Sequence, residues 1–202
     1  MIVPSARETP VSTPTQEERQ AQEALAYIRR TMESASTFTA LSGWGLVGVG
    51  LIGLVAAGLS WQVGVPERLK VWLPAAALGV LCAGIANAGK ARRLDVPLWS
   101  GSFRKVAWVM SPALAAGTLL TVALYDAGAR HLIPGTWLAL YGAGVTAGGT
   151  FSIRAVRWMG MALLVLGAFA FLVPEQSIVF LGLGFGVLHI LFGLYVVRKH
   201  GG

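Results

Sequence analysis

His189 is the residue with the clearest chemical potential in the apolar part of this chain. It lies within the apolar stretch 177 to 197, whereas His131 and His200 lie outside such stretches. A neutral imidazole in that setting could bind a metal, ligate haem or relay a proton. Haem held by two histidines requires a second one at similar depth, and the sequence provides none. A hydrogen bond to a neighbouring helix is therefore the simpler interpretation of His189.

Three further side chains could react or bind inside apolar stretches. Asn87 is polar and follows a run of small residues, so it suits hydrogen bonding between helices, or the lining of a pore together with His189. Ser111 precedes Pro112, and we expect its hydroxyl to satisfy a backbone group that the proline frees. Cys82 is the single cysteine, which excludes an internal disulfide and predicts an unreactive thiol.

Acidic and metal-binding patterns are sparse. None of the nine Asp and Glu residues falls in the middle of an apolar stretch, which weighs against a carboxylate-driven antiporter or proton path. No C-x-x-C-H, H-E-x-x-H or paired Cys/His spacing occurs. We therefore expect no enzymatic activity, no metal and no cofactor.

The elements that position these side chains are predicted to be membrane helices. Apolar residues make up 55% of the 202 residues, charged residues 12%, and the mean hydropathy is +0.66, a balance typical of membrane proteins. Six stretches approach the length of about 20 residues that crosses a bilayer. They are residues 41 to 62, 71 to 90, 105 to 125, 135 to 152, 156 to 174 and 177 to 197. The fold class is thus an all-α polytopic membrane protein, with a six-helix transmembrane domain over residues 41 to 197.

The distribution of basic residues predicts the topology. Of the 16 Lys and Arg, only Arg68, Lys70 and Arg130 fall on one side of the predicted spans, and the other 13 fall on the opposite side. Because Lys and Arg loops stay cytoplasmic, both termini are predicted inside the plasma (inner) membrane. The tail 1 to 14 is predicted to be disordered and the tail 198 to 202 cytoplasmic. The high pI of about 10.2 is then a topology signal and requires no nucleic-acid partner.

The spans also suggest three hairpins built as repeats. Pro74, Pro134 and Pro174 are each predicted to begin the second helix of a hairpin, and a glycine follows ten residues later in every case. Chance is the competing explanation, because the chain has 26 glycines. The GxxxG pairs 144/148 and 182/186 predict close helix packing, within this chain rather than between chains.

A charged amphipathic helix is predicted ahead of the spans, over residues 15 to 40. Thr15 and Glu18 have capping-box spacing, and an apolar stripe at heptad spacing follows. The larger side chains of this stripe are Leu25, Ile28 and Met32, and Phe38 lies beside the stripe. These four are the predicted partner-binding residues. Between residues 17 and 33 four Glu and three Arg nearly cancel. A lipid-anchoring helix is usually basic, so this stripe favours packing against protein: a cytosolic partner, a second copy or this protein's own inner loops.

The stretch "YIRRTMESASTFTALSGWG", residues 27 to 45, resembles the opening of small uncharacterised bacterial membrane proteins. In those proteins a charged helix runs into several spans. The resemblance implies a topology and no activity.

Two functional hypotheses follow from the sequence. The first is a non-enzymatic membrane subunit or signalling scaffold, embedded in the lipid bilayer, whose N-terminal helix docks a protein partner or a second copy. The second is a small uncoupled transporter or channel for a neutral or anionic solute, with Asn87 and His189 as its polar lining.

Overall fold

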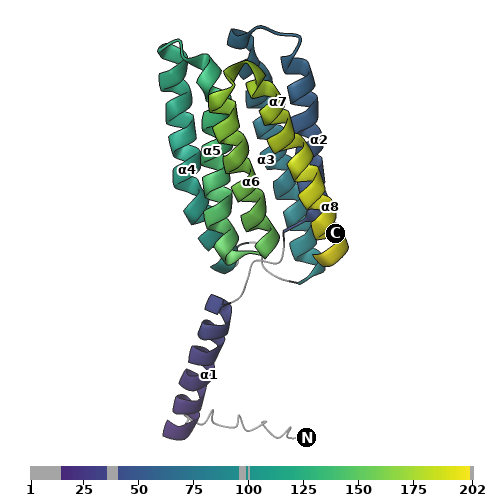
Figure 1. Cartoon of the computed structure of the whole chain (residues 1–202). Helices are drawn as coiled ribbons and strands as arrows, with labels where there is room; N and C mark the ends of the chain where they lie inside the picture. Colours follow the sequence, from purple (N-terminus) through teal and green to yellow (C-terminus); the bar gives the residue numbers. More distant parts are fainter. Residues whose placement is uncertain (1–14, 36–40, 96–98, 100, 201–202) are drawn as a thin grey trace, which may run out of the picture. The chain divides into compact units, whose positions relative to one another are not determined.

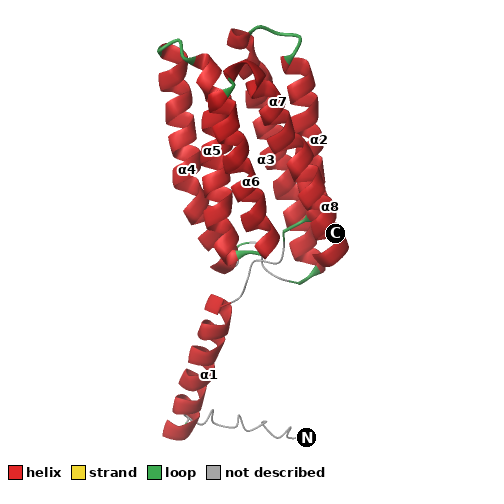
Figure 2. Cartoon of the chain, viewed as in Figure 1, coloured by secondary structure: helices red, strands yellow, loops and turns green. Residues whose placement is uncertain are grey.

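The computed structural model describes residues 15–35, 41–95, 99 and 101–200, and every regular element in these ranges is helical (Figure 2). The chain divides into two units, Met1–Ser36 and Thr37–Gly202. Each unit is described separately below.

The first unit contains helix α1, Gln16–Ala35. Its sequence is rich in Ala, Gln, Glu and Arg, which have high helix propensity. The N–H group of Arg19 donates to the carbonyl of Thr15 at 3.1 Å, so the first helical turn begins where the capping-box pattern predicted. The predicted helix 15 to 40 is thus observed to Ala35, and its last predicted residues, like the predicted tail 1 to 14, lie outside the described ranges.

The second unit is a bundle of long apolar helices (Figure 1). In chain order they are α2 Gly43–Ser60, α3 Arg68–Arg93, α4 Gly101–Asp126, α5 Ile133–Gly148 and α6 Arg154–Leu172, followed by a continuous rod of α7 Ser177–Leu181, the π-helical η5 Gly182–Leu188 and α8 His189–His200. Within the described ranges, five segments are long and apolar enough to cross a membrane. The fourth predicted span corresponds to α5, whose 16 residues are fewer than in those five segments.

The bundle consists of two helix groups joined by the C-terminal rod. Helix α2 packs against α3 on one side and against the rod on the other, while α5 packs between α4 and α6. The rod contacts α2, α5 and α6, so it lies between the groups (Figure 1). The helices α3 and α4 are therefore peripheral, and most of their apolar side chains face outward.

Glycines bring α2 and the rod into backbone contact. A methyl group added at Gly53 would lie 2.5 Å from the carbonyl oxygen of Phe185, and one at Gly50 would lie 2.8 Å from that of Gly186. Nearer the C-terminus, a methyl group at Gly193 would lie 2.8 Å from the carbonyl oxygen of Gly43. Such close approach gains dispersion contacts that larger side chains would prevent.

A second glycine seam joins α5 and α6. A methyl group at Gly142 would lie 2.8 Å from the amide nitrogen of Leu164, and one at Gly167 would lie 2.8 Å from that of Ala139. Both predicted GxxxG pairs also face helices of this chain. Gly144 and Gly148 lie against α4, and Gly182 and Gly186 lie against α2. The predicted use of these pairs within one chain is confirmed.

The prolines occupy two kinds of position. Pro134 lies in the first turn of α5 and Pro174 begins the 3₁₀ helix η4, Pro174–Gln176, as predicted. The prediction for Pro74 is wrong, because Pro74 lies inside α3. The proline near the start of that helix is Pro66, in the 3₁₀ helix η1, Val65–Glu67. A proline at a helix start leaves no intrahelical donor missing, so Pro66 suits the role that was assigned to Pro74. The three-hairpin repeat stays a prediction.

Ser111 has the predicted role beside Pro112. Pro112 lies inside α4 and cannot donate to the carbonyl of Trp108. The Ser111 hydroxyl donates to that carbonyl oxygen at 2.9 Å. An exposed carbonyl in an apolar environment is costly, and the serine removes that cost.

Candidate functional site

The centre of the bundle is built around the π-helical segment η5. Its glycines alternate in direction, since Gly182 and Gly186 face α2 whereas a methyl group at Gly184 would lie 2.5 Å from Leu138 on α5. The surrounding core includes the fully buried Leu138 and Leu163. π-Helical turns are rare and frequently occur at functional sites, so this segment is the first place to look for chemistry.

His189 follows η5 directly and is completely buried. Its Nδ1 lies 2.8 Å from the carbonyl oxygen of Gly184, and its Nε2 lies 3.3 Å from the Tyr141 hydroxyl. A carbonyl oxygen can only accept, so Nδ1 carries a proton, and in the neutral ring the Tyr141 O–H donates to Nε2. Both ring nitrogens are therefore hydrogen-bonded inside the protein.

Aromatic rings surround this imidazole. The centroid of Phe185 lies 5.7 Å from that of His189 and 5.0 Å from that of Tyr141. The ring of Trp72 on α3 lies 6.1 Å from Phe185. The cluster thus connects α3, α5 and the rod. Within it, His189 has a structural role, because its hydrogen bonds and ring contacts hold the π-helical turn against α5.

Asn87 belongs to a separate hydrogen-bond network, at the N-terminus of α2. Its side-chain oxygen accepts a hydrogen bond from the N–H group of Ser42 at 2.8 Å. The Ser42 hydroxyl in turn accepts from the N–H group of Gly45 at 3.2 Å, as an N-cap does. The buried Lys90 donates to the carbonyl of Leu41 at 3.1 Å. Together these contacts fix the start of the first apolar helix against the end of α3.

The structure does not bring Asn87 and His189 together. Asn87 lies at the level of Ser42, whereas the segment leading to His189 packs beside Gly50 and Gly53 of α2. Along a helix that separation is roughly 10 Å or more. Because each side chain has a partner within the bundle, helix packing alone accounts for both residues.

Three of the four predicted partner-binding residues belong to α1, which ends at Ala35. Leu25 is 65% exposed and Ile28 is 52% exposed, and α1 is the one element described in its unit. Met32 belongs to the same helix, but its side chain, like all of Phe38, lies outside what the structure describes. The described part of the stripe is therefore an apolar face without cover in its own unit.

Sequence reasoning missed a group of buried donors at the opposite end of the bundle from Asn87. Among the described residues, three buried side-chain N–H groups lack an acceptor, and they belong to Arg68, Trp72 and Arg130. Arg68 and Trp72 lie one turn apart on α3, and Arg130 belongs to the 3₁₀ helix η2, Arg130–Leu132, which contacts η1. The signal in the sequence was that both arginines belong to the basic minority on one side of the spans.

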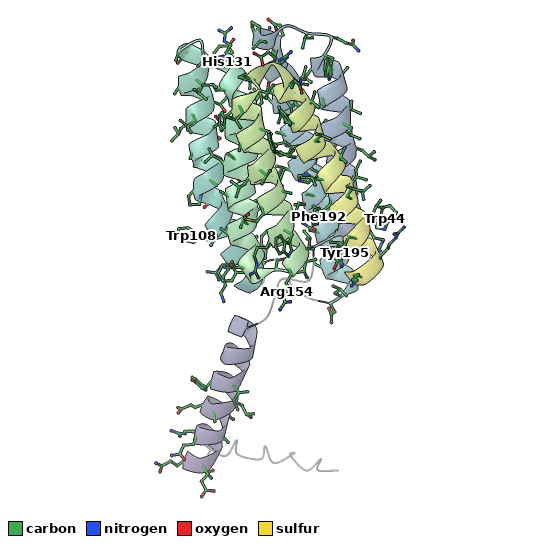
Figure 3. The ribbon with its side chains drawn as sticks, viewed as in Figure 1. Trp44, Trp108, His131, Arg154, Phe192 and Tyr195 are labelled. Carbon is green, nitrogen blue, oxygen red and sulfur yellow. The ribbon has the colours of Figure 1, made fainter. Side chains whose placement is uncertain are left out.

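Exposed tryptophans lie at both ends of the bundle, and Trp61, just beyond the end of α2, is 69% exposed. Trp44, Trp108 and Trp158 are 58%, 80% and 69% exposed. Figure 3 shows Trp44 and Trp108 on opposite flanks of the bundle at the same end, with His131 at the far end. Tryptophan favours the headgroup level of a bilayer, so these side chains form an aromatic belt of the kind found at a membrane interface.

In the described parts of the chain, no three His, Cys, Asp or Glu side chains lie together in a way that could hold a metal ion.

These features define the class: in the part of the chain that the structure describes, every regular element is helical, and five helices are long and apolar enough to cross a membrane. Comparison with protein-family models, curated proteins and solved structures finds no match to this chain.

Proposed function

We propose that this protein is a non-enzymatic integral membrane subunit or scaffold whose helix α1 docks a protein partner. The observation that carries the proposal is the exposed stripe of Leu25 and Ile28 on a helix that forms a unit of its own. An apolar stripe at heptad spacing fits the groove or the helix of another protein. The near balance of Glu and Arg on α1 supports protein rather than anionic lipid as the surface that it meets.

The proposal places the bundle in the plasma membrane with six spans and both termini in the cytoplasm. Five spans have the required length and apolarity. Helix α5 rises about 24 Å, and the adjoining 3₁₀ helices η2 and η3, Gly149–Phe151, add about 6 Å each. The helical run of about 36 Å is therefore long enough to cross a hydrocarbon core of about 30 Å.

The test is co-purification of the full-length protein from native membranes in a mild detergent, with the mass and stoichiometry of the complex measured. We expect a stoichiometric complex with the wild-type chain that is lost in the double variant Leu25→Glu/Ile28→Glu. The matched control is Gln20→Glu/Gln22→Glu, which adds the same two charges to α1 outside the stripe and should keep the complex. Deletion of residues 15 to 39 that left every partner and the oligomeric state unchanged would refute the proposal.

A second candidate is the uncoupled transporter or channel, now for an anionic solute. The specific observation in its favour is the set of buried N–H donors on Arg68, Trp72 and Arg130, two of them on cationic side chains, which are complementary to an anion. The test is anion flux in proteoliposomes, where Arg68→Gln/Arg130→Gln should abolish flux and Arg104→Gln, at an exposed position on α4, should not. Absence of flux from the wild-type protein would remove this candidate.

A further inference from the structure

A groove opens between α6 and α8 at the end of the bundle that carries the aromatic belt. It has a volume of about 520 Å³, within the range of ligand sites. Its lining residues come from one turn of α6 and one turn of α8, and they are Arg154, Ala155, Trp158, Leu191, Phe192 and Tyr195. Figure 3 shows Arg154 at the lower edge of the bundle, with Phe192 and Tyr195 above it on α8.

The glycine seams explain why a groove exists here. Gly160 holds α6 against α5, and Gly193 holds α8 against α2. Near the middle of the bundle, η5 fills the space between the two pairs, because Gly184 packs against Leu138 and Leu163. Beyond η5, α6 packs mainly against α5 and α8 mainly against α2, so α6 and α8 contact each other only sparsely.

The charge around the groove has one sign. Helices α6 and α8 contain no Asp or Glu, and the ends that flank the groove carry the exposed Arg154, Arg157, Arg198 and Lys199. The Lys199 ammonium lies 5.6 Å from the ring centroid of Tyr195, which brings a second cation toward the lining. This end of the groove is therefore complementary to an anion.

The rest of the lining is apolar and faces outward. Trp158 is 69% exposed, Leu191 57% and Tyr195 43%. A small hydrated anion would gain nothing from these side chains, whereas a hydrocarbon chain would bury them. The exposed Trp158 also sets the depth, because tryptophan favours the headgroup level.

We propose that the groove between α6 and α8 binds one anionic phospholipid, with its phosphate at Arg154 and an acyl chain along Trp158, Leu191 and Phe192. Basic pockets between membrane helices on the cytoplasmic side are known to bind acidic headgroups. The site is independent of partner docking by α1, because it lies wholly within the second unit.

The first experiment is native mass spectrometry of the full-length protein in detergent, incubated with phosphatidylglycerol or phosphatidylcholine of identical chains. We expect retention of one phosphatidylglycerol in preference to phosphatidylcholine. Since one basic residue near the surface is worth about fivefold in affinity, Arg154→Gln should weaken phosphatidylglycerol binding about fivefold, and Arg154→Lys should largely preserve it. The matched control Arg104→Gln removes an equal charge from the exposed surface of α4 and should leave binding unchanged.

The second experiment separates a lipid from free phosphate. Ala155→Phe fills the groove and should displace the lipid, whereas Ala115→Phe at an exposed position on α4 should not, and inorganic phosphate should fail to compete. Equal retention of the two lipids, an equal loss in Arg104→Gln, or full competition by phosphate would each overturn the proposal. If Ala155→Phe does not fold, the two arginine variants decide the question, because both positions are exposed.

Discussion

The seam between α2 and the C-terminal rod gives a sharp prediction for Gly53→Ala. The added methyl group would lie 2.5 Å from the carbonyl oxygen and 2.7 Å from the carbonyl carbon of Phe185. Both atoms belong to backbone, so α2 and η5 must move apart by several tenths of an ångström or more. Overpacking of this kind costs about 1–3 kcal/mol, because the displaced helices lose a large part of their dispersion contacts.

Gly58→Ala is the matched control, since a methyl group at Gly58 on the same helix meets nothing within 4 Å. Both variants gain the helix propensity of alanine, about 1 kcal/mol, so this gain cancels between them. The difference in the free energy of unfolding is then the overpacking cost alone. For a chain of this size, the melting temperature of Gly53→Ala should be roughly 5 °C below that of Gly58→Ala.

The chain carries its own reporter for this measurement. Cys82 is the single cysteine, and its Sγ lies 2.5 Å from the position of a methyl group built on Gly48 of α2. Cys82 is half-buried, so the rise in its labelling rate by a thiol-reactive fluorophore, on heating in detergent, follows the loosening of α2 against α3. If Gly53→Ala and Gly58→Ala melt together, the backbone contact at Gly53 does not exist in the protein, and the glycine seam is wrong.

Two other predictions concern the buried hydrogen bonds. Tyr141→Phe leaves the Nε2 acceptor of His189 unpaired and should lower the free energy of unfolding by about 1–3 kcal/mol. The control is Tyr195→Phe, whose ring is half-exposed. Equal melting temperatures of the two variants would contradict the assigned hydrogen bond. Asn87→Leu removes the acceptor of the Ser42 N–H group and should cost about 1 kcal/mol, measured by the same thermal assay, whereas an unchanged melting temperature would show that the start of α2 is held by other contacts.

The sequence alone determined the helical and apolar character of the chain. Residue type and spacing suffice for this purpose, because a backbone in an apolar environment must satisfy its hydrogen bonds within helices. The helices therefore fall close to the predicted spans. The role of Ser111 was also predictable, since a proline frees the carbonyl four residues earlier on the same helix.

Other features depended on distances that a linear pattern does not contain. From the sequence we predicted that Pro74 begins a helix. In the structure Pro66 lies at the start of that helix and Pro74 lies inside it. The sequence pattern could not distinguish the two, because each proline is compatible with the apolar run. Asn87 and His189 looked equivalent as polar residues in spans. In the structure, the packing of α3 against the N-terminus of α2 pairs Asn87 with Ser42, and the packing of η5 against α5 pairs His189 with Tyr141.

The groove is likewise a consequence of tertiary structure. Its lining comes from two helices whose contributing turns are more than thirty residues apart, and it opens because Gly160 and Gly193 hold those helices to different neighbours. Composition therefore determined where the chain can reside, since transfer from water to lipid depends on residue type. Packing determined which surfaces remain open to bind, since that depends on how closely particular backbones approach.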